Sequence, residues 1–97
     1  MRVEYHPALA AELAAVRDHY EALSPGLGRG FVDEFEQQVQ RMATAPERWL
    51  VVAPGLRRCL MKRFPYVIYF RVLGEEHIRV TVVKHQRRHP LLGRERR

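Results

Sequence analysis

Residues 67–85 read VIYFRVLGEEHIRVTVVKH and decide the fold. Two runs rich in β-branched and aromatic residues flank Gly74-Glu75-Glu76, which has the composition of a turn. This pattern predicts two strands, Val67–Leu73 and His77–His85, joined as an antiparallel hairpin.

A third strand is expected over Arg57–Arg63, separated from the hairpin by Phe64-Pro65-Tyr66. Alternation along a strand assigns the faces. In the strand His77–His85, one face carries Ile78, Val80 and Val82, and the other carries Arg79, Thr81, Val83 and His85. In the strand Arg57–Arg63, one face carries Arg58, Leu60 and Lys62, and the other carries Arg57, Cys59, Met61 and Arg63. Neither face is purely apolar. One side must therefore cover other elements, and the side carrying Arg and Lys becomes the candidate functional surface.

The upstream half changes from a period of two to a helical period. Val3 and Tyr5 alternate with polar residues, which predicts a short first strand, and Pro7 is expected at the first position of a helix. Apolar residues then recur at spacings of 4, 3, 4 and 3, at Leu9, Leu13, Val16, Tyr20 and Leu23. They form one face of an amphipathic helix, which Ser24-Pro25-Gly26-Leu27-Gly28 breaks.

A second helix is expected over Arg29–Thr44, ended by Pro46. Its apolar stripe is Phe31, Phe35, Val39 and Met42, and Asp33, Glu34 and Glu36 are expected on a solvated face. The short connection predicts an antiparallel helix hairpin. Residues 49–55 are interpreted as an apolar crossover, with Trp49 as an anchor at the edge of the core rather than a stacking platform for a base.

The elements define an α+β fold in the order β-α-α-β-β-β, with an antiparallel sheet packed against an N-terminal helix hairpin. The chain has 97 residues, 46% of them apolar, which predicts a single domain over residues 1–97. The lone cysteine, Cys59, excludes a disulfide within the chain and is interpreted as a packing residue. Without an apolar leader or a membrane-length segment, a cytoplasmic protein is expected.

Charge is distributed unevenly along the chain. Residues 1–50 hold five Arg against eight Asp or Glu, a net charge of −3, whereas residues 51–97 hold twelve Lys or Arg against three Glu, a net charge of +9. Guanidinium groups fixed on a sheet bind phosphate or carboxylate, so the expected partner is nucleic acid or an acidic protein segment. His85 and His89 lack a third metal-ligating neighbour, so neither a metal nor a cofactor is expected.

The chain resembles the RelE/ParE superfamily of toxins from bacterial type II toxin–antitoxin systems, and it is closer to the ParE branch. The matching segments run through nearly the whole chain: His6-Pro7-Ala8 with Glu12-Leu13, Tyr20, Pro25-Gly26-Leu27-Gly28 with Phe31, Pro46, Arg57-Arg58, Lys62 to Tyr69, and Val83 to Pro90. The resemblance implies the fold described above and a cognate antitoxin as partner.

Two targets are implied, one in each branch of the superfamily. Toxins of the first branch cut mRNA in the ribosomal A site, typically with an Arg just after the aromatic that opens the middle strand and an aromatic or His near the C-terminus. Here Val67 follows Tyr66, and residues 91–94 lack an aromatic. Only for a ribonuclease would His85, Arg58 and Arg87 be the catalytic candidates.

Toxins of the second branch poison DNA gyrase. The Phe64-Pro65-Tyr66 corner and the segment from His85 to Pro90 favour this branch, so the protein is expected to be a gyrase poison rather than an enzyme, with the ribonuclease as the alternative. For either target the binding candidates are Arg57, Arg58, Lys62, Arg63, Arg87 and Arg88.

An acidic, amphipathic antitoxin segment is expected to fold on the toxin. Its expected contacts on the helix hairpin are Leu13, Val16, Tyr20, Phe31 and Phe35. A small basic nucleic-acid-binding protein is the third interpretation. It is the least favoured because neither helix is Arg-rich and the sheet lacks paired exposed aromatics.

Overall fold

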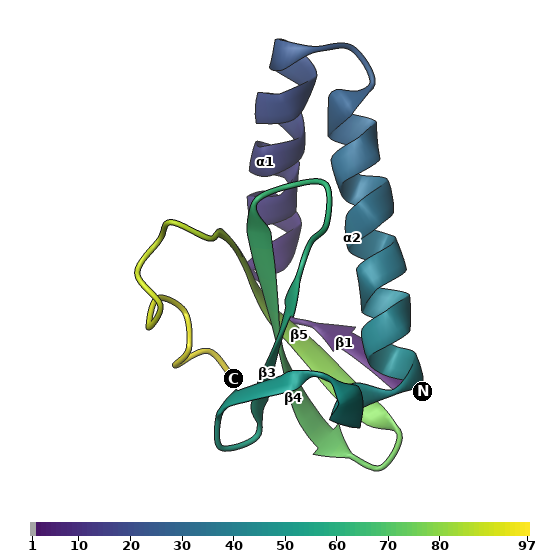
Figure 1. Ribbon diagram of the computed structural model, residues 1–97, viewed down its shortest axis with the longest axis vertical. Helices are drawn as coiled ribbons and strands as arrows, with labels where there is room; N and C mark the ends of the chain where they lie inside the picture. The colour runs from purple at the N-terminus through teal and green to yellow at the C-terminus, as the bar shows by residue number, and fades with distance from the viewer. Residues whose placement is uncertain (1) are drawn as a thin grey trace.

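The computed structural model describes residues 2–97. Its elements are β1 (Arg2–Tyr5), α1 (Leu9–Leu23), α2 (Leu27–Thr44), a short 3-10 helix η1 (Pro46–Arg48), β2 (Leu50–Ala53), β3 (Leu56–Leu60), β4 (Tyr66–Gly74) and β5 (His77–His85). The helices form a hairpin that stands over the sheet, as Figure 1 shows. The α+β class and the predicted order of strand, helix hairpin and sheet are confirmed.

The tip of the helix hairpin is held by a side chain from α1. The two oxygens of the Glu21 carboxylate accept hydrogen bonds from the backbone N–H groups of Gly26 (2.9 Å) and Gly28 (3.0 Å). These N–H groups lie at the start of α2, where no helical carbonyl can accept them and where a negative charge is favourable. A Cβ at Gly28 would lie 2.4 Å from the carbonyl oxygen of Arg17, so glycine lets the two helices approach closely. The first helix begins at Leu9, so Pro7 precedes it instead of occupying its first position.

The sheet has five strands in the order β1-β5-β4-β3-β2. It is mixed, because β1 pairs in parallel with β5 while the other pairs are antiparallel. The predicted crossover over residues 49–55 contains an edge strand, β2, which turns back onto β3 through Pro54 and Gly55. The predicted strand Arg57–Arg63 is shorter than expected, since β3 ends at Leu60 and residues 61–65 form a loop beside the helices (Figure 1).

An irregularity in β5 changes which side chains face the helices. Tyr69 pairs with Val82 and Phe70 with Val80, so Thr81 is an extra residue in the ladder. Before this bulge Ile78 and Val80 face the helices; after it, Val83 does so, whereas Val82 packs on the opposite face with Tyr69. The prediction that Val82 shares a face with Ile78 and Val80 while Val83 lies on the other is therefore wrong.

The main core lies between the hairpin and one face of the sheet. Its centre is aromatic: the Phe31 ring lies 5.2 Å from the rings of Phe64 and Tyr66, centroid to centroid. Cys59 is 1% exposed, and burial raises the pKa of its thiol to about 11, so the packing interpretation holds. Trp49 packs at the margin of this core with the Arg41 guanidinium over its ring, in agreement with the predicted edge anchor.

Glu34 departs from the prediction of a solvated acidic face. It is 5% exposed, and its carboxylate accepts the backbone N–H groups of Lys62 at 2.6 Å and Arg63 at 2.8 Å. Burial raises the pKa of this carboxyl, but the hydrogen bonds from Lys62, Arg63 and Gln38 outweigh burial and lower the pKa overall. A charged side chain of α2 thus fixes the loop that joins β3 to β4. The sequence signal of this role was weak, because helical spacing alone places Glu34 beside the apolar stripe.

Candidate functional site

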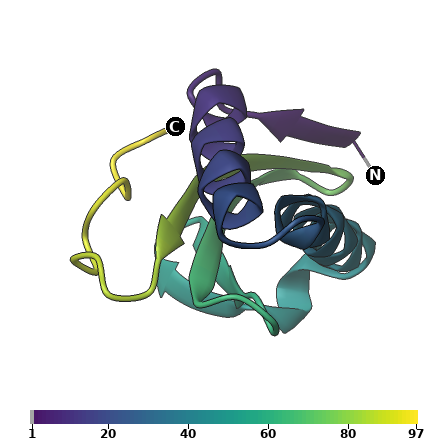
Figure 2. The same cartoon turned by 90° about the horizontal axis from the view of Figure 1, so that it is seen from above.

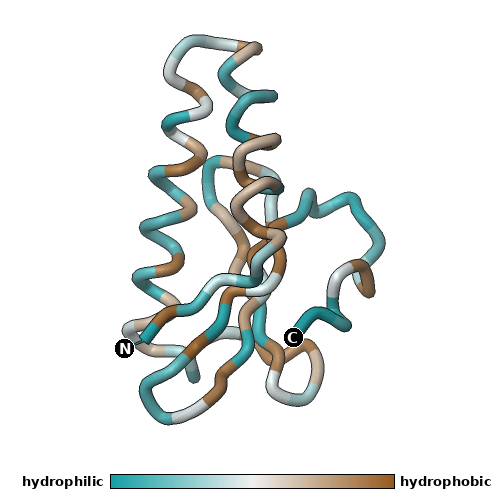
Figure 3. The backbone as a smooth tube through the Cα atoms, turned by 180° about the vertical axis from the view of Figure 1, so that it is seen from behind, coloured by the Kyte–Doolittle hydropathy of each residue, from teal (hydrophilic) through white to brown (hydrophobic). Residues whose placement is uncertain are grey.

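The face of the sheet turned away from the helices is covered by residues 86–97, here called the strap. Figures 1 and 2 show it as the yellow segment that leaves β5 and runs past the sheet, and Figure 3 shows it from behind as mostly hydrophilic. The strap is held chiefly by cationic side chains of the sheet that donate hydrogen bonds to its backbone carbonyls.

Lys84 is the central anchor of the strap. Its ammonium donates to the carbonyl oxygens of His89 (2.8 Å), Pro90 (3.0 Å) and Leu92 (2.8 Å) and lies 4.7 Å from the centre of the Tyr69 ring. The Tyr69 hydroxyl donates to the Pro90 carbonyl at 3.1 Å. Lys84 is 7% exposed, so carbonyl dipoles and the π-face of Tyr69 replace the water that a lysine normally keeps.

Arg71 and Gly93 fix the second half of the strap. The Arg71 guanidinium donates to the carbonyls of Arg94 (2.7 Å) and Arg96 (2.8 Å). Gly93 has φ +83°, and a Cβ there would lie 2.8 Å from a methyl group of Val82. Glycine is therefore required by both the backbone conformation and the close approach to the sheet.

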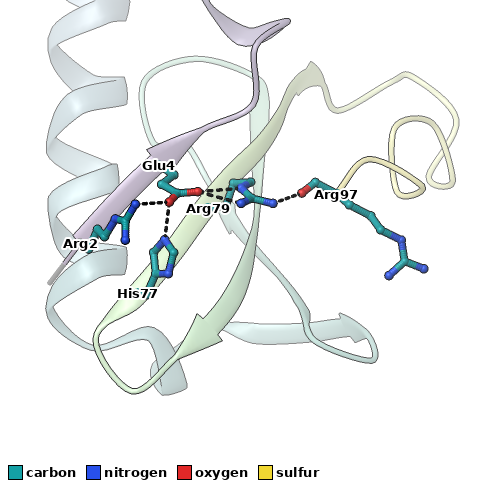
Figure 4. Close-up of polar contacts among 5 residues, drawn as sticks. All are labelled: Arg2, Glu4, His77, Arg79 and Arg97. Atoms are coloured by element: carbon teal, nitrogen blue, oxygen red, sulfur yellow. Dashed lines mark hydrogen bonds and ion pairs between the residues drawn. The ribbon is translucent and has the colours of Figure 1, made fainter.

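Glu4 links the strap to the first strand through Arg79 (Figure 4). Its carboxylate accepts two hydrogen bonds from the Arg79 guanidinium, at 2.8 and 3.1 Å, and also lies 2.9 Å from His77 Nε2 and 2.9 Å from Arg2 Nη2. Arg79 donates in turn to the backbone carbonyl of Arg97. The hydrogen bonds from Arg79, followed by the contacts with His77 and Arg2, hold the pKa of Glu4 below its usual value.

The strap is also tied to α1. The Arg96 guanidinium donates two hydrogen bonds of 2.6 Å to the Glu12 carboxylate and a third, of 3.2 Å, to the Thr81 carbonyl. The hydrogen bonds from Arg96 lower the pKa of Glu12, and the pKa of Arg96 is raised by the same contact. Sequence analysis gave no role to Lys84, Arg71 or Arg96, because nothing local marks a cation that binds distant carbonyls.

The predicted target-binding residues do not form one surface. Arg57 lies on the helix side of the sheet edge, where its guanidinium donates to the Trp49 carbonyl at 3.0 Å. Lys62 and Arg63 lie in the β3–β4 loop near the start of α2, where the Arg63 guanidinium lies 3.6 Å from where a Cβ on Gly30 would be.

Arg58 lies on the strap side, paired with Tyr69, and Arg87 and Arg88 are exposed at the start of the strap. Of the six predicted residues, the structure brings Arg58 and Arg88 to one groove, described below.

The candidates for ribonuclease chemistry are also separated. His85 pairs with Tyr66 at the end of β5, and their rings meet edge to face at 5.3 Å between centroids. Its Nδ1 accepts the backbone N–H of Arg87 at 3.0 Å. Because Tyr66 belongs to the helix side and Arg58 to the strap side, His85 and Arg58 face opposite sides of the sheet.

An apolar groove runs between the two helices near β1. Its volume is about 510 Å³, and the lining side chains include Leu9, Ala10, Leu13, Ala14, Val32 and Phe35. We call it the hairpin groove.

The predicted antitoxin contacts fall in different places relative to the hairpin groove. Leu13 lines it, and Phe35, 3% exposed, forms part of its floor. Phe31 is 0% exposed and packs in the main core, away from the surface of the hairpin groove. Val16 lines a hollow toward the end of β5, and Tyr20 packs against Phe64 with ring centroids 4.9 Å apart.

The described residues also limit other classes of site. Within residues 2–97, three His, Cys, Asp or Glu side chains nowhere gather closely enough to hold a metal ion. No helix in this range combines the length and the apolar character needed to cross a membrane.

A helix hairpin over one face of the sheet and a cation-anchored strap over the other make a small α+β domain. The model of the family described as "ParE toxin of type II toxin-antitoxin system, parDE" matches residues 3–90, and the chain belongs to this family. A solved structure described as the chromosomal ParDE TA system from P. aeruginosa contains a similar chain, with a TM-score of 0.75 and 26% identity over 88% of this chain and 95% of that chain. No curated protein matches the sequence.

Proposed function

We propose that this ParE-family toxin inhibits growth in the cytoplasm by poisoning DNA gyrase. The observation that carries the proposal is the match of residues 3–90 to a family whose members are ParE toxins. The geometry adds support, because His85 and Arg58 lie on opposite faces of the sheet and do not converge on one phosphodiester bond. Val67, at the position where a ribonuclease would carry an arginine, is 5% exposed and packs with Tyr69.

Inducible expression in bacteria without the antitoxin tests the target. DNA and protein synthesis are followed in parallel by pulse labelling. Gyrase poisoning predicts early loss of DNA synthesis with an SOS response. It also predicts that replacement of His85, whose ring packs on Tyr66, leaves toxicity largely unchanged. Early loss of protein synthesis with mRNA cuts in the ribosomal A site would refute the proposal and establish the alternative ribonuclease.

The toxin is further proposed to be neutralised by a cognate antitoxin that places apolar side chains in the hairpin groove. The groove is open, and Leu13 and Phe35 offer the apolar surface that an amphipathic segment needs. The strap side carries a cluster of cations that includes Arg58 and Arg88, so an acidic segment reaches both this cluster and the hairpin groove only by passing round an edge of the sheet. Such a wrapped segment would neutralise charge and bury apolar surface together.

Two adjacent alanines of α1 provide a matched test of this docking site. Ala10 and Ala11 are both exposed, but Ala10 lines the hairpin groove and Ala11 does not. Ala10→Glu should weaken antitoxin binding by at least about tenfold, the effect of roughly 1.4 kcal/mol, whereas Ala11→Glu adds the same charge outside the groove and should leave it nearly unchanged. Binding is measured by calorimetry with the antitoxin encoded beside the gene. Equal affinities of the two variants would exclude the groove as the docking site.

A further inference from the structure

A second groove lies on the strap side of the sheet, between β3 and the start of the strap. Its volume is about 250 Å³, and four cationic side chains line it: Arg58 from β3, Lys84 from β5, and Arg88 and Arg94 from the strap. The remaining lining is apolar or uncharged, with Tyr69 on the floor and Leu60 at the rim. Carboxylates are absent from this lining. We call it the sheet-face groove.

The four positive charges in the sheet-face groove are not neutralised by the protein. Within residues 2–97, the side chains of Arg58 and Arg88 make no hydrogen bond or ion pair. Arg94 Nε is buried without a hydrogen-bond partner, and its Nη1 makes only a long contact of 3.4 Å with the Val52 carbonyl. Lys84 binds three carbonyl oxygens and the Tyr69 ring, none of which carries a formal negative charge.

Mutual repulsion of these cations costs free energy in the free protein, and an anion bound among them would recover it. The Arg94 guanidinium, which belongs to this lining, has a buried Nε without a hydrogen-bond partner, so the protein does not satisfy all of its donors. Donors are therefore in excess, and acceptors are what the sheet-face groove lacks.

The arrangement of donors favours a phosphate over a carboxylate. The carboxylates of this chain meet their cations in one plane or on a strand edge, as in the Arg96–Glu12 pair at 2.6 Å and in the contacts of Glu4 with Arg79 and Arg2. The three guanidinium groups of the sheet-face groove come from β3 and from two separate positions in the strap, and the tetrahedral oxygens of a phosphate accept from several such directions. The small volume suits one phosphate group better than a large ligand, since pockets for drug-sized molecules span roughly 300–1,000 Å³.

We propose that the sheet-face groove binds a phosphate group of a nucleic-acid backbone, with Arg58, Arg88 and Arg94 as its hydrogen-bond donors and Lys84 as a supporting charge. The inference rests on the proposed function, because a gyrase poison meets its target on DNA. It also gives the strap a purpose, since Arg88 and Arg94 belong to the strap and the groove exists only while the strap is docked. The anchors at Lys84 and Arg71 then act as positioning residues for the site.

Titration followed by NMR tests the proposal on the full chain. Inorganic phosphate is added at constant ionic strength, with chloride as the reference anion, and the backbone amide shifts of residues 56–60 and 86–94 are followed. Saturable shifts in these segments are expected. Arg58→Gln and Arg88→Gln should each weaken phosphate binding about tenfold or more, because each removes a charge-assisted hydrogen bond. Arg29→Gln, which removes an exposed arginine on α2, is the matched control and should change nothing in these segments.

A short single-stranded and a duplex oligodeoxynucleotide are then compared with a glutamate-rich peptide of equal charge. Competition between phosphate and either oligonucleotide supports the proposal. Non-saturable shifts, equal binding by the Arg58→Gln and Arg29→Gln variants, or binding of the peptide alone would overturn it. Toxicity of the wild-type chain is scored separately. A wild-type chain that binds phosphate but does not poison gyrase refutes the proposed function. A wild-type chain that is toxic but binds no phosphate refutes this inference.

Discussion

Replacing Glu34 by glutamine should destabilise the protein far more than its neutral, nearly isosteric character suggests. The carboxylate accepts two backbone N–H groups, from Lys62 at 2.6 Å and Arg63 at 2.8 Å, in a site where Glu34 is 5% exposed. A glutamine has one acceptor oxygen, so one N–H group retains a neutral hydrogen bond and the other faces an NH₂ group.

The magnitude follows from these two hydrogen bonds. Exchanging a charge-assisted for a neutral hydrogen bond costs about 1 kcal/mol, and leaving a buried donor unsatisfied costs about 1–3 kcal/mol. The expected loss in the free energy of unfolding is therefore about 2–4 kcal/mol. Glu36→Gln is the control on the same helix; because Glu36 is exposed, its effect should stay within about 0.5 kcal/mol.

Urea unfolding, followed by the fluorescence of Trp49, measures both variants, and its pH dependence gives a second check. The folded protein holds the pKa of Glu34 below its ordinary value of 4.5, so the native state binds fewer protons than the unfolded state in this range. Stability from Glu34 is therefore present above pH 4.5 and lost as pH falls through the folded pKa. The difference between wild type and Glu34→Gln should shrink on acidification. A Gln variant within 0.5 kcal/mol of wild type at pH 7 would refute the assignment of Glu34 as the anchor of the β3–β4 loop.

Three further outcomes are expected. Glu12→Gln weakens the contact with Arg96 and should raise amide hydrogen exchange in residues 93–96, with less than about 1 kcal/mol of global destabilisation because the pair is partly exposed; unchanged exchange would contradict its role. Gly28→Ala places a Cβ 2.4 Å from the Arg17 carbonyl and should lower stability by about 1–3 kcal/mol in thermal unfolding, unless the helices separate freely. Cys59, with a pKa of about 11, should react with a thiol reagent at pH 8 only as fast as the protein unfolds; rapid labelling of the native state would show an open core.

The helices were predictable from sequence because their determinants are local. Apolar spacing placed the first helix at Leu9–Leu23, and the break after Leu23 indicated the hairpin, although α2 begins at Leu27, inside the predicted break and before the predicted start at Arg29. The edge strand β2 was missed although Pro54-Gly55 is a turn signal, because a strand of four residues beside a tryptophan does not alternate clearly. The bulge at Thr81 has no signal in the sequence. A run of β-branched residues fits either face of a sheet, and the pairing of Val82 with Tyr69 decides which face each residue takes.

The candidate site was less predictable than the fold, for a physical reason. Sequence identified a basic half of the chain but treated its cations as equivalent. The structure divides them into anchors that bind carbonyls, such as Lys84, and side chains without an internal partner, such as Arg58 and Arg88. Which role a cation takes depends on where the strap carbonyls lie, and these are fixed by contacts such as Gly93 on Val82.

The parallel pairing of β1 with β5 has a consequence for the order in which a growing chain can fold. Residues 2–5 hydrogen-bond to a strand that begins at His77, so β1 cannot pair in the sheet until residues 77–80 have been synthesised. Until then α1 lacks the part of the sheet that covers its apolar face, and the strap has no strand to lie on. An interrupted translation product ending before His77 should therefore lack a cooperative unfolding transition by circular dichroism. For a member of a toxin family, this topology postpones any activity that needs the complete sheet until β5 has been synthesised.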